Sequence, residues 1–386
     1  MTELHTFQIV IPTIKGREKY LNDAINSVLK QDNSDISVIV SNNGADPAIK
    51  TCVEAFNSSR IIYFETQKQL VMAEHWELAI SHVTADFFSI IGDDDALTAS
   101  CMYYVNQALQ KFPNTLSIVH KPAQYFWPDY LVNEHRNLYI VHGTNTGEII
   151  EMPTKDIFNK VCEFREHYGN LPFLYHGFVS TSLVRKIQNQ EGRIFARIAP
   201  DIYSDLLLGE YLSRFVIIDA TLTVGGQSAK SNGANVLGGT EAGKVFFENI
   251  PDFLAPKRPG MSVYLQLFEY IEKIKGRKTQ NIKWNLNWIN FFLHSWVEAI
   301  KHESYYGTII QGIKDVLNVY CPTHKRFFFL IAMQISEFKF ARIILRWILK
   351  LKEAQNYKKW SNAENDFSAS SVIDVAWAIN LRKKID

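Results

Sequence analysis

Short apolar segments alternate with amphipathic helical patterns along the N-terminal part of this sequence. The apolar segments lie at residues 7–11, 36–40, 61–64, 87–91 and 116–119. Between them the apolar residues follow a helical spacing, as at residues 72–83. Strands that alternate with helices of this length form a mostly parallel sheet covered by helices on both faces. The pattern therefore predicts an α/β fold for this part of the chain.

Composition limits the classes of protein to consider. The chain has 386 residues, 47% of them hydrophobic, a size that favours about two domains. Its net charge of +1 gives no field that would attract nucleic acid. The four cysteines form no Cys-x-x-Cys pair, which favours reduced thiols in a cytoplasmic protein. Residues 1–8 do not resemble a secretory signal, and no run of about 18 apolar residues would span a membrane.

Three consecutive carboxylates, Asp93, Asp94 and Asp95, follow the fourth apolar segment directly after Gly92. Ligands of open α/β sheets bind just beyond the carboxyl ends of such strands. One interpretation is that Asp95 caps a helix starting near Thr98 while the other two acids face solvent. The other is a site for a hard divalent ion, since Mg²⁺ typically takes one or two carboxylates together with substrate phosphates.

The loop after the first predicted strand contains Pro12 and Thr13 rather than a glycine-rich GxGxxG or GxxxxGK motif. Such glycine loops cradle the phosphates of dinucleotides and of nucleoside triphosphates. Their absence argues against a dehydrogenase and against a P-loop enzyme. The phosphates of a bound nucleotide would need another counter-charge, which a metal on the acidic residues would supply.

Two later segments are informative. Residues 121–150 are rich in aromatic and turn residues and predict a hairpin with strands at 138–141 and 148–150. This segment is either a surface insertion or a place that holds a second substrate. Asp201 follows Pro200 and precedes a helical pattern, so it is expected in the first turn of a helix, where the helix dipole favours a negative charge.

Beyond residue 237 the sequence is helical in character. Residues 327–351 are strongly apolar and include cations, namely Lys339, Arg342, Arg346 and Lys350. One interpretation is a helix that lies on a membrane surface, with basic residues beside an apolar face. The other is a helix that packs inward in a C-terminal bundle, as apolar stripes at helical spacing usually do.

Several of these segments resemble one known family. They are residues 10–13 with Arg17, residues 38–44, residues 73–79, residues 85–88 leading into 92–95, and residues 200–204. In this order and spacing the sequence resembles the family 2 glycosyltransferases of GT-A fold. The resemblance covers about residues 7–232. It implies a Rossmann-like, mostly parallel sheet flanked by helices at residues 1–237, followed by an α-helical C-terminal domain at residues 238–386.

The resemblance also implies a nucleotide-diphosphate-sugar donor, with a UDP-sugar favoured, and a DxD motif that binds Mn²⁺ or Mg²⁺. The metal ligand is Asp94 or Asp95, depending on the register of the motif, and Asp93 lies near the ribose. The family's base- and ribose-binding positions correspond to Pro12, Thr13 and Asn43. The usual acid after the second strand is replaced here by Asn42 or Asn43. Arg17 and Lys230 are candidates for added positive charge.

The catalytic base of the family corresponds to Asp201, with Asp205 as a fallback. His176 and Trp127 are candidate acceptor contacts, although a histidine in such a position is often structural. The implied activity is metal-dependent, inverting transfer of a sugar to the hydroxyl of a saccharide or lipid-linked saccharide in bacterial polysaccharide biosynthesis. The implied location is cytoplasmic, peripheral at the inner face of the membrane, with a homo-oligomer as a further expectation. The alternatives are a non-catalytic sugar-binding module on the same fold and a sugar-1-phosphate nucleotidyltransferase.

Overall fold

The computed structural model describes residues 5–32, 35–196, 199–233, 235, 240, 262–275, 286–302, 305–337, 343, 361–362 and 370–382. It divides the chain into two compact units. Unit 1 comprises Met1–Lys155, Leu171–Ser231 and Ser361–Asp386, and unit 2 comprises Asp156–Asn170 and Asn232–Trp360. These units differ from the consecutive ranges expected from the sequence, 1–237 and 238–386, because the chain returns to unit 1 at its C-terminal end.

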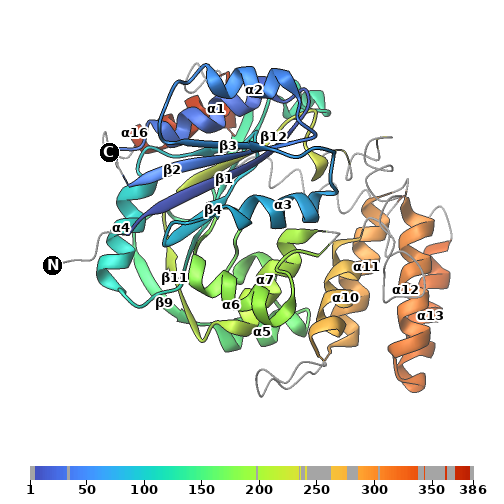
Figure 1. The fold of residues 1–386 in the computed structure, drawn as a ribbon. Coiled ribbons are helices and arrows are strands. Elements are labelled where there is room, and N and C mark those ends of the chain that lie inside the picture. Colours follow the sequence, from blue (N-terminus) through green and yellow to red (C-terminus); the bar gives the residue numbers. More distant parts are fainter. Residues whose placement is uncertain are drawn as a thin grey trace. The chain divides into compact units, whose positions relative to one another are not determined.

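Unit 1 is built on an eight-stranded sheet in the order β3-β2-β1-β4-β10-β6-β11-β9 (Figure 1). The strands are β1 (Phe7–Ile14), β2 (Ile36–Asn43), β3 (Ile61–Glu65), β4 (Phe87–Ile90), β6 (Ser117–His120), β9 (Ile149–Pro153), β10 (Phe178–Ser180) and β11 (Arg214–Ile218). The strands β3, β2, β1 and β4 are parallel, as β6 and β11 are, whereas β10 and β9 run antiparallel to their neighbours. The predicted α/β fold with a mostly parallel sheet is confirmed.

Helices cover both faces of this sheet. On one face, α1 (Glu18–Leu29), α2 (Pro47–Glu54) and α4 (Cys101–Lys111) bury their apolar residues in one core with alternate strand residues. On the other face, α3 (Met72–Ser81) contacts β1 and β2, and α6 (Thr181–Glu191) contacts β10 (Figure 1). The helix α7 (Pro200–Tyr211) belongs to the same unit. Because the strands are covered on both faces, they read as continuous apolar runs in the sequence.

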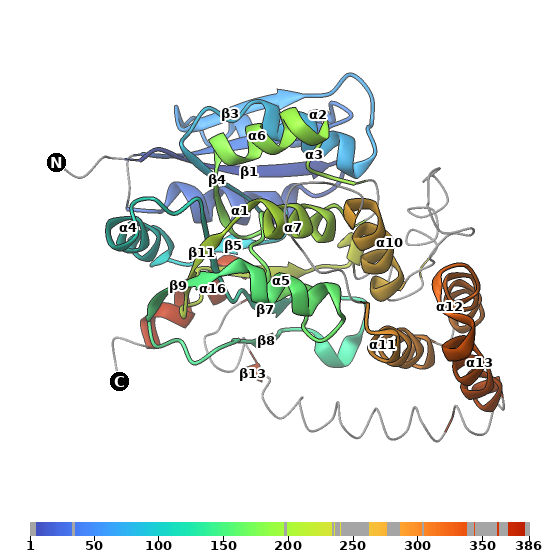
Figure 2. The same cartoon turned by 90° about the horizontal axis from the view of Figure 1, so that it is seen from below.

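A second sheet in unit 1 has the order β13-β8-β7-β12-β5. Its strands are β5 (Ala96–Leu97), β7 (Ala123–Phe126), β8 (Leu138–Ile140), β12 (Thr223–Gln227) and β13 (Ser361–Asn362), and η1 (Asn133–His135) precedes β8. The helix α16 (Val372–Arg382) packs against α1, β5 and β12 (Figure 2). Its apolar residues share a core with Tyr125, Trp127 and Val224. The end of the chain therefore helps to build the domain that carries the acidic residues.

The predicted hairpin of residues 138–141 and 148–150 is wrong. The strand β8 pairs with β7 and β13 in the smaller sheet, whereas β9 pairs with β11 in the larger one. Between them, the carboxylate of Asp219 accepts hydrogen bonds from the backbone of Asn145 at 3.2 Å and of Thr146 at 3.0 Å. These contacts turn the chain from one sheet to the other, which the local turn signal did not reveal.

Unit 2 is helical in its described part. It contains most of α5 (Thr154–Cys162) together with η2 (Tyr168–Asn170), α10 (Val263–Lys275), α11 (Trp288–Lys301), α12 (Tyr306–Tyr320) and α13 (Thr323–Glu337). Aromatic rings of Phe268, Phe291 and Phe329 lie in its core. Among the described helices, none combines the length and the apolar character needed to cross a bilayer. The cations Lys339, Arg342, Arg346 and Lys350 lie outside the described residues.

Candidate active site

The three consecutive acids lie between the two sheets of unit 1, after β4 and before β5. All three are buried, with Asp93, Asp94 and Asp95 exposing only 3%, 5% and 1% of their surface. The interpretation of a helix cap with two solvated acids is therefore wrong. The next helix, α4, begins at Cys101 after Ser100, and the side chain of Asp95 turns instead toward β12. Three adjacent buried carboxylates need specific partners, because burial penalises their charged forms.

Asp93 is held by the end of β1, which extends to Ile14 and therefore includes Thr13, and by Arg17 directly before α1. Its Oδ2 accepts a hydrogen bond from Thr13 Oγ1 at 2.7 Å, and its Oδ1 accepts one from Arg17 Nη1 at 2.8 Å. Burial raises the pKa of Asp93 to about 6, even though Arg17 and Thr13 act in the opposite direction. Burial lowers the pKa of Arg17, but the charges of Asp93 and Asp94 outweigh it and raise that pKa overall. The structure thus brings together three predicted donor-site residues.

Asp94 is held by the segment after β12. Its Oδ2 accepts hydrogen bonds from Ser228 Oγ, at 2.7 Å, and from Ser231 Oγ. Its backbone carbonyl accepts a bond from the indole Nε1 of Trp127 at 3.1 Å. Among the described residues, no hydrogen bond reaches Asp94 Oδ1. One oxygen of this carboxylate therefore keeps its capacity to bind a further group.

Both carboxylate oxygens of Asp95 accept hydrogen bonds from groups of the protein. Its Oδ2 accepts from the Gly92 backbone at 2.5 Å and from the Tyr175 hydroxyl at 2.6 Å, and its Oδ1 accepts from the Gly226 backbone at 2.8 Å. The imidazole Nε2 of His176 lies 3.4 Å from Oδ2. Burial and the neighbouring Asp94 raise the pKa of Asp95 to about 7. Asp95 thus ties β4 to β12 and to the segment before β10.

The strand β12 runs beside β7 as far as Gln227 and contains two consecutive glycines, Gly225 and Gly226. Gly226 lies so close to the acidic residues that a Cβ atom there would be 1.8 Å from the Asp94 carbonyl oxygen. The Gly225-Gly226 pair was the sequence signal for this close approach, because glycine inside a strand often marks a place where another backbone comes near.

The segment after β12 lies over the loop after β1. Lys230 Nζ donates a hydrogen bond to the carbonyl of Gly16, and Arg17 Nη2 donates one to the carbonyl of Lys230. The side chain of Lys230 is exposed. The two predicted cations therefore lie side by side near Asp93 and Asp94.

The amides after β2 are engaged within the protein. Asn43 donates to the Leu70 carbonyl at 2.9 Å and accepts from the Leu70 backbone at 2.8 Å. Asn42 donates to the Tyr63 hydroxyl at 2.9 Å and to the Asp46 carbonyl at 2.8 Å. Pro12, the remaining residue predicted to bind the nucleotide, lies in β1 directly beside the end of β2. Their contacts with a nucleotide stay predictions, and Asn43 shapes the 66–70 loop.

Asp201 lies in the first turn of α7, as predicted, and its side chain is partly buried. Burial raises its pKa above the usual value. The pKa of Tyr175 is raised by burial and by the charges of Asp95, Asp94 and Asp201. Tyr175 therefore lies within electrostatic reach both of the acidic row, Asp93 to Asp95, and of Asp201. More than a hundred residues separate the acidic row from Asp201 in the sequence. Asp205, the fallback base, is buried and has a strongly raised pKa.

The two predicted acceptor contacts, Trp127 and His176, are both buried. Besides its approach to Asp95, His176 contacts Thr223 Oγ1 through Nδ1 at 2.9 Å, and burial lowers its pKa to about 3, so the ring is neutral. Trp127 bonds the backbone of Asp94. An acceptor role stays a prediction for both, whereas their observed contacts hold the acidic residues in place.

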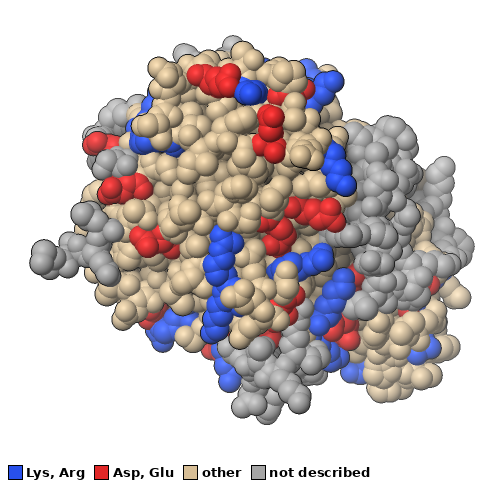
Figure 3. Space-filling view, viewed as in Figure 1, with Lys and Arg blue, Asp and Glu red and all other residues tan. Residues whose placement is uncertain are grey.

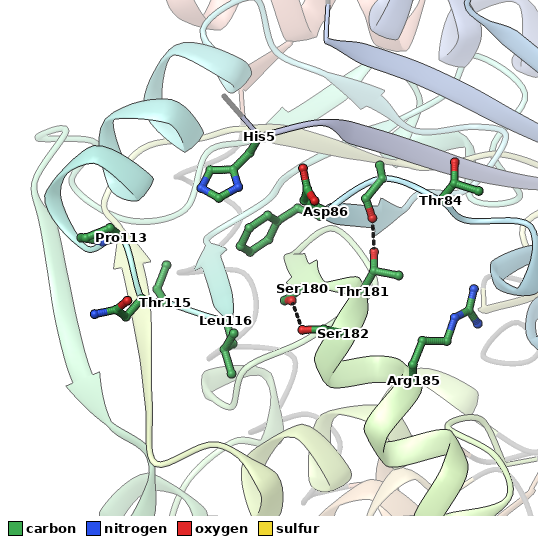
Figure 4. A pocket seen from close by; sticks show the side chains of 13 residues that line it. His5, Thr84, Asp86, Pro113, Thr115, Leu116, Ser180, Thr181, Ser182 and Arg185 are labelled. Atoms are coloured by element: carbon green, nitrogen blue, oxygen red, sulfur yellow. Dashed lines mark hydrogen bonds between the residues drawn. The ribbon is translucent and has the colours of Figure 1, made fainter. Parts of the chain in front are cut away.

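Two further features bear on a ligand. Among the described residues, no cluster of three or more side chains drawn from His, Cys, Asp and Glu is arranged so that it could hold a metal ion by itself. A cavity of about 580 Å³ lies where β4 begins, at the end of that strand away from the three acids, and is lined by Asp86, Thr181 and Arg185 among others (Figure 4). Its Arg185 is occupied by the backbone carbonyls of Ile80, Ser81 and Val83. Acidic and basic side chains are interspersed over the described part of the face shown in Figure 3.

Comparison with solved structures finds similarity to TarS of S. aureus. The structure of TarS 1–349 in complex with UDP has a TM-score of 0.44 and 14% identity, and the match covers 91% of this chain and 92% of that one. The structure of TarS 1–349 in complex with UDP-GlcNAc has a TM-score of 0.44 and 14% identity, covering 80% of this chain and 90% of that one. Comparison with curated proteins found no match.

Comparison with protein families gives a match that includes the acidic row. Residues 8–164 match the family described as glycosyl transferase family 2. The matched segment contains most of β1 with Thr13, the end of β2, and Asp93, Asp94 and Asp95 themselves. This match agrees with the resemblance of the sequence and with the mixed α/β architecture. Residues 8–164, which hold the three acids, are therefore similar to glycosyl transferase family 2.

Proposed function

We propose that this protein transfers a sugar from a nucleotide-diphosphate-sugar, a UDP-sugar in the first instance, to an acceptor hydroxyl with inversion at the anomeric carbon. The observation that carries the proposal is the buried row of Asp93, Asp94 and Asp95 beside Arg17, at the carboxyl end of β4. Burial of three adjacent acids is costly for folding, and carboxylates with perturbed pKa values such as Asp93 and Asp95 cluster at functional sites. Asp93, fixed by Arg17 and Thr13, is assigned to the ribose side of the donor.

The residues fit a divalent cation whose coordination would be completed by the phosphates of the donor. Asp94 keeps Oδ1 free of hydrogen bonds within the described residues, and two serine hydroxyls lie beside its other oxygen. This all-oxygen set suits Mg²⁺ or Mn²⁺, which use few protein carboxylates together with substrate phosphates. We therefore assign the metal to Asp94 rather than Asp95. When bound, the metal would stabilise the negative charge of the leaving diphosphate as a Lewis acid.

Asp201 is assigned as the base that removes the proton from the acceptor hydroxyl. As the oxygen of that hydroxyl attacks the anomeric carbon, its proton passes to the Asp201 carboxylate, and the bond to the diphosphate breaks on the opposite face of the sugar. A raised pKa suits this role, since a base works best when its pKa lies near the operating pH. Lys230 and Arg17 add positive charge near the departing phosphates.

For the acceptor, we propose a saccharide or lipid-linked saccharide used in assembling a bacterial surface polysaccharide. Working at the inner face of the cell membrane would then place the enzyme in the cytoplasm as a peripheral protein. Assembly into a homo-oligomer belongs to the same proposal and is tested by measuring the mass in solution. Screening binding of UDP-, GDP-, dTDP- and CMP-sugars would identify the donor.

Replacing Asp94 by asparagine is expected to remove the effect of Mn²⁺ on donor binding. Calorimetry with UDP should show that Mn²⁺ strengthens binding to the unaltered protein. The variant should lose this gain, on the order of a hundredfold, because a metal contact with a diphosphate is worth several kcal/mol. Asp86→Asn at the other end of β4, where Asp86 bonds Thr6, is the matched control and should keep the gain. Equal Mn²⁺ dependence of Asp94→Asn and the unaltered protein would reject the assignment.

Replacing Asp201 by asparagine is expected to lower the transfer rate by about 10²–10⁴-fold while donor binding stays unchanged. Since the base must be ionised and its pKa is raised, activity should fall as the pH drops through a value above the ordinary aspartate range. The measurement is the pH profile of kcat/KM for the acceptor. The residual activity of Asp201→Asn should lack this acidic limb. If Asp205→Asn loses the limb instead, Asp205 is the base.

A further inference from the structure

The hairpin of α12 and α13 in unit 2 exposes large apolar side chains on one side. Phe327 and Phe328 expose 64% and 71% of their surface, and Val319 and Ile331 are also exposed. At 100° per residue, Phe327, Phe328 and Ile331 fall on one face of α13. The opposite face, with Phe329 and Met333, is buried. The hairpin thus has an ordinary core side and a second apolar side that no described part of the chain covers.

The same end of α13 is positively charged. Lys325 and Arg326 lie in its first turn, which contains no acidic residue. Cations at a helix N-terminus are unfavourable, because the helix dipole is positive there. Arg326 offsets part of this by donating to the Cys321 carbonyl at 3.0 Å, while Lys325 is exposed. A binding partner that carries negative charge beside an apolar region would complement both the cation and the exposed phenylalanines.

We infer that this side of the α12–α13 hairpin binds an anionic phospholipid surface. Phenylalanine side chains would enter the boundary between headgroups and acyl chains, and the exposed Lys325, which lies next to Phe328 around the helix, would contact the acidic headgroups. A neutral bilayer would complement only the apolar part of this surface, and a soluble acidic partner would complement only the charged part. The inference extends the proposed function, but its test measures membrane binding rather than transfer, so either can fail without the other.

The test is flotation of the full-length protein with vesicles. Binding is expected to vesicles that contain phosphatidylglycerol, to weaken as salt is added, and to be absent with phosphatidylcholine alone. Phe327→Ser/Phe328→Ser should weaken binding on the order of tenfold or more, because each ring buries substantial apolar area. Lys325→Glu should weaken binding to anionic vesicles by about fivefold or more, since one cation near such a surface is worth about 1 kcal/mol.

The matched control is Ile289→Ser/Leu293→Ser on α11, where the two side chains expose 61% and 45% without a cation in the first turn. This variant should bind like the unaltered protein. Circular dichroism confirms that each variant is folded, and light scattering gives its mass. Failure of the unaltered protein to bind anionic vesicles overturns the inference. So does a loss of oligomer mass in Phe327→Ser/Phe328→Ser with unchanged vesicle binding, which would assign this surface to a second copy of the chain.

Discussion

Replacing Gly226 by alanine is expected to lower the free energy of unfolding by about 2–4 kcal/mol and to abolish donor binding. An added Cβ would lie 1.8 Å from the Asp94 carbonyl oxygen, 2.7 Å from the Asp94 carbonyl carbon and 2.7 Å from Trp127 Nε1. Two of these atoms belong to the backbone and cannot turn away. The strands would have to separate, which would break the bond from the Gly226 backbone to Asp95 and displace Asp94.

The neighbouring Gly225 provides a matched control. A Cβ at Gly225 would meet His176 Nε2 at 3.5 Å and the Ala123 carbonyl oxygen at 3.7 Å, which are ordinary contact distances. Gly225→Ala should therefore change stability by less than about 1 kcal/mol, since alanine is tolerated where there is room. Urea denaturation followed by circular dichroism, together with calorimetry of nucleotide binding, makes the comparison. Equal losses for the two variants would mean that close approach at Gly226 does not organise the site.

Replacing Arg17 by methionine is expected to cost about 3–5 kcal/mol, because it leaves the buried carboxylate of Asp93 without its cation. Asp93 is 3% exposed, and Thr13 would be its remaining partner. The double variant Arg17→Met/Asp93→Asn should recover much of the lost stability, since no uncompensated charge then remains. Donor binding should stay lost in both, because the pair is assigned to the ribose and phosphate side of the donor.

Lys19, an exposed cation close to Arg17 in the sequence, provides a control for the loss of a positive charge in general. Lys19 is 64% exposed at its side chain and lies 3.9 Å from Asp129. Lys19→Met should therefore cost less than about 1 kcal/mol, as exposed ion pairs do. Denaturant titrations of the unaltered protein, Arg17→Met, Asp93→Asn and the double variant give the coupling between Arg17 and Asp93. Additive losses in the double variant would show that the pair contributes no interaction energy of its own.

Much of the fold followed from local pattern. Apolar segments predicted β1, β2, β3, β4 and β6, and helical spacing predicted α1 to α4, because period and turn residues are properties of neighbouring positions in the chain. The acidic row was also visible, since a buried strand that ends in glycine and three carboxylates is unusual. Asp201 was placed in the first turn of α7 by the same kind of local signal.

Contacts between distant segments could not be predicted in this way. The separation of β8 from β9 depends on Asp219, far along the chain, and α16 returns to pack beside α1 after all of unit 2. The predicted acceptor contacts, Trp127 and His176, proved to be buried because β7 and β12 close over the acidic row. These arrangements depend on which surfaces meet, and a single sequence does not state that.

The sequence by itself determined that three carboxylates end a buried strand of an α/β sheet, because strand, turn and charge are encoded by adjacent residues. Only the tertiary structure decided how those carboxylates differ. Arg17 neutralises Asp93, and backbone amides with Tyr175 enclose Asp95. Serines after β12 bond one oxygen of Asp94, and the described part of the chain leaves its other oxygen without a hydrogen bond. The physical reason is that the environment of a buried charge is set by the groups that pack against it, and here those groups come from segments far apart in the sequence.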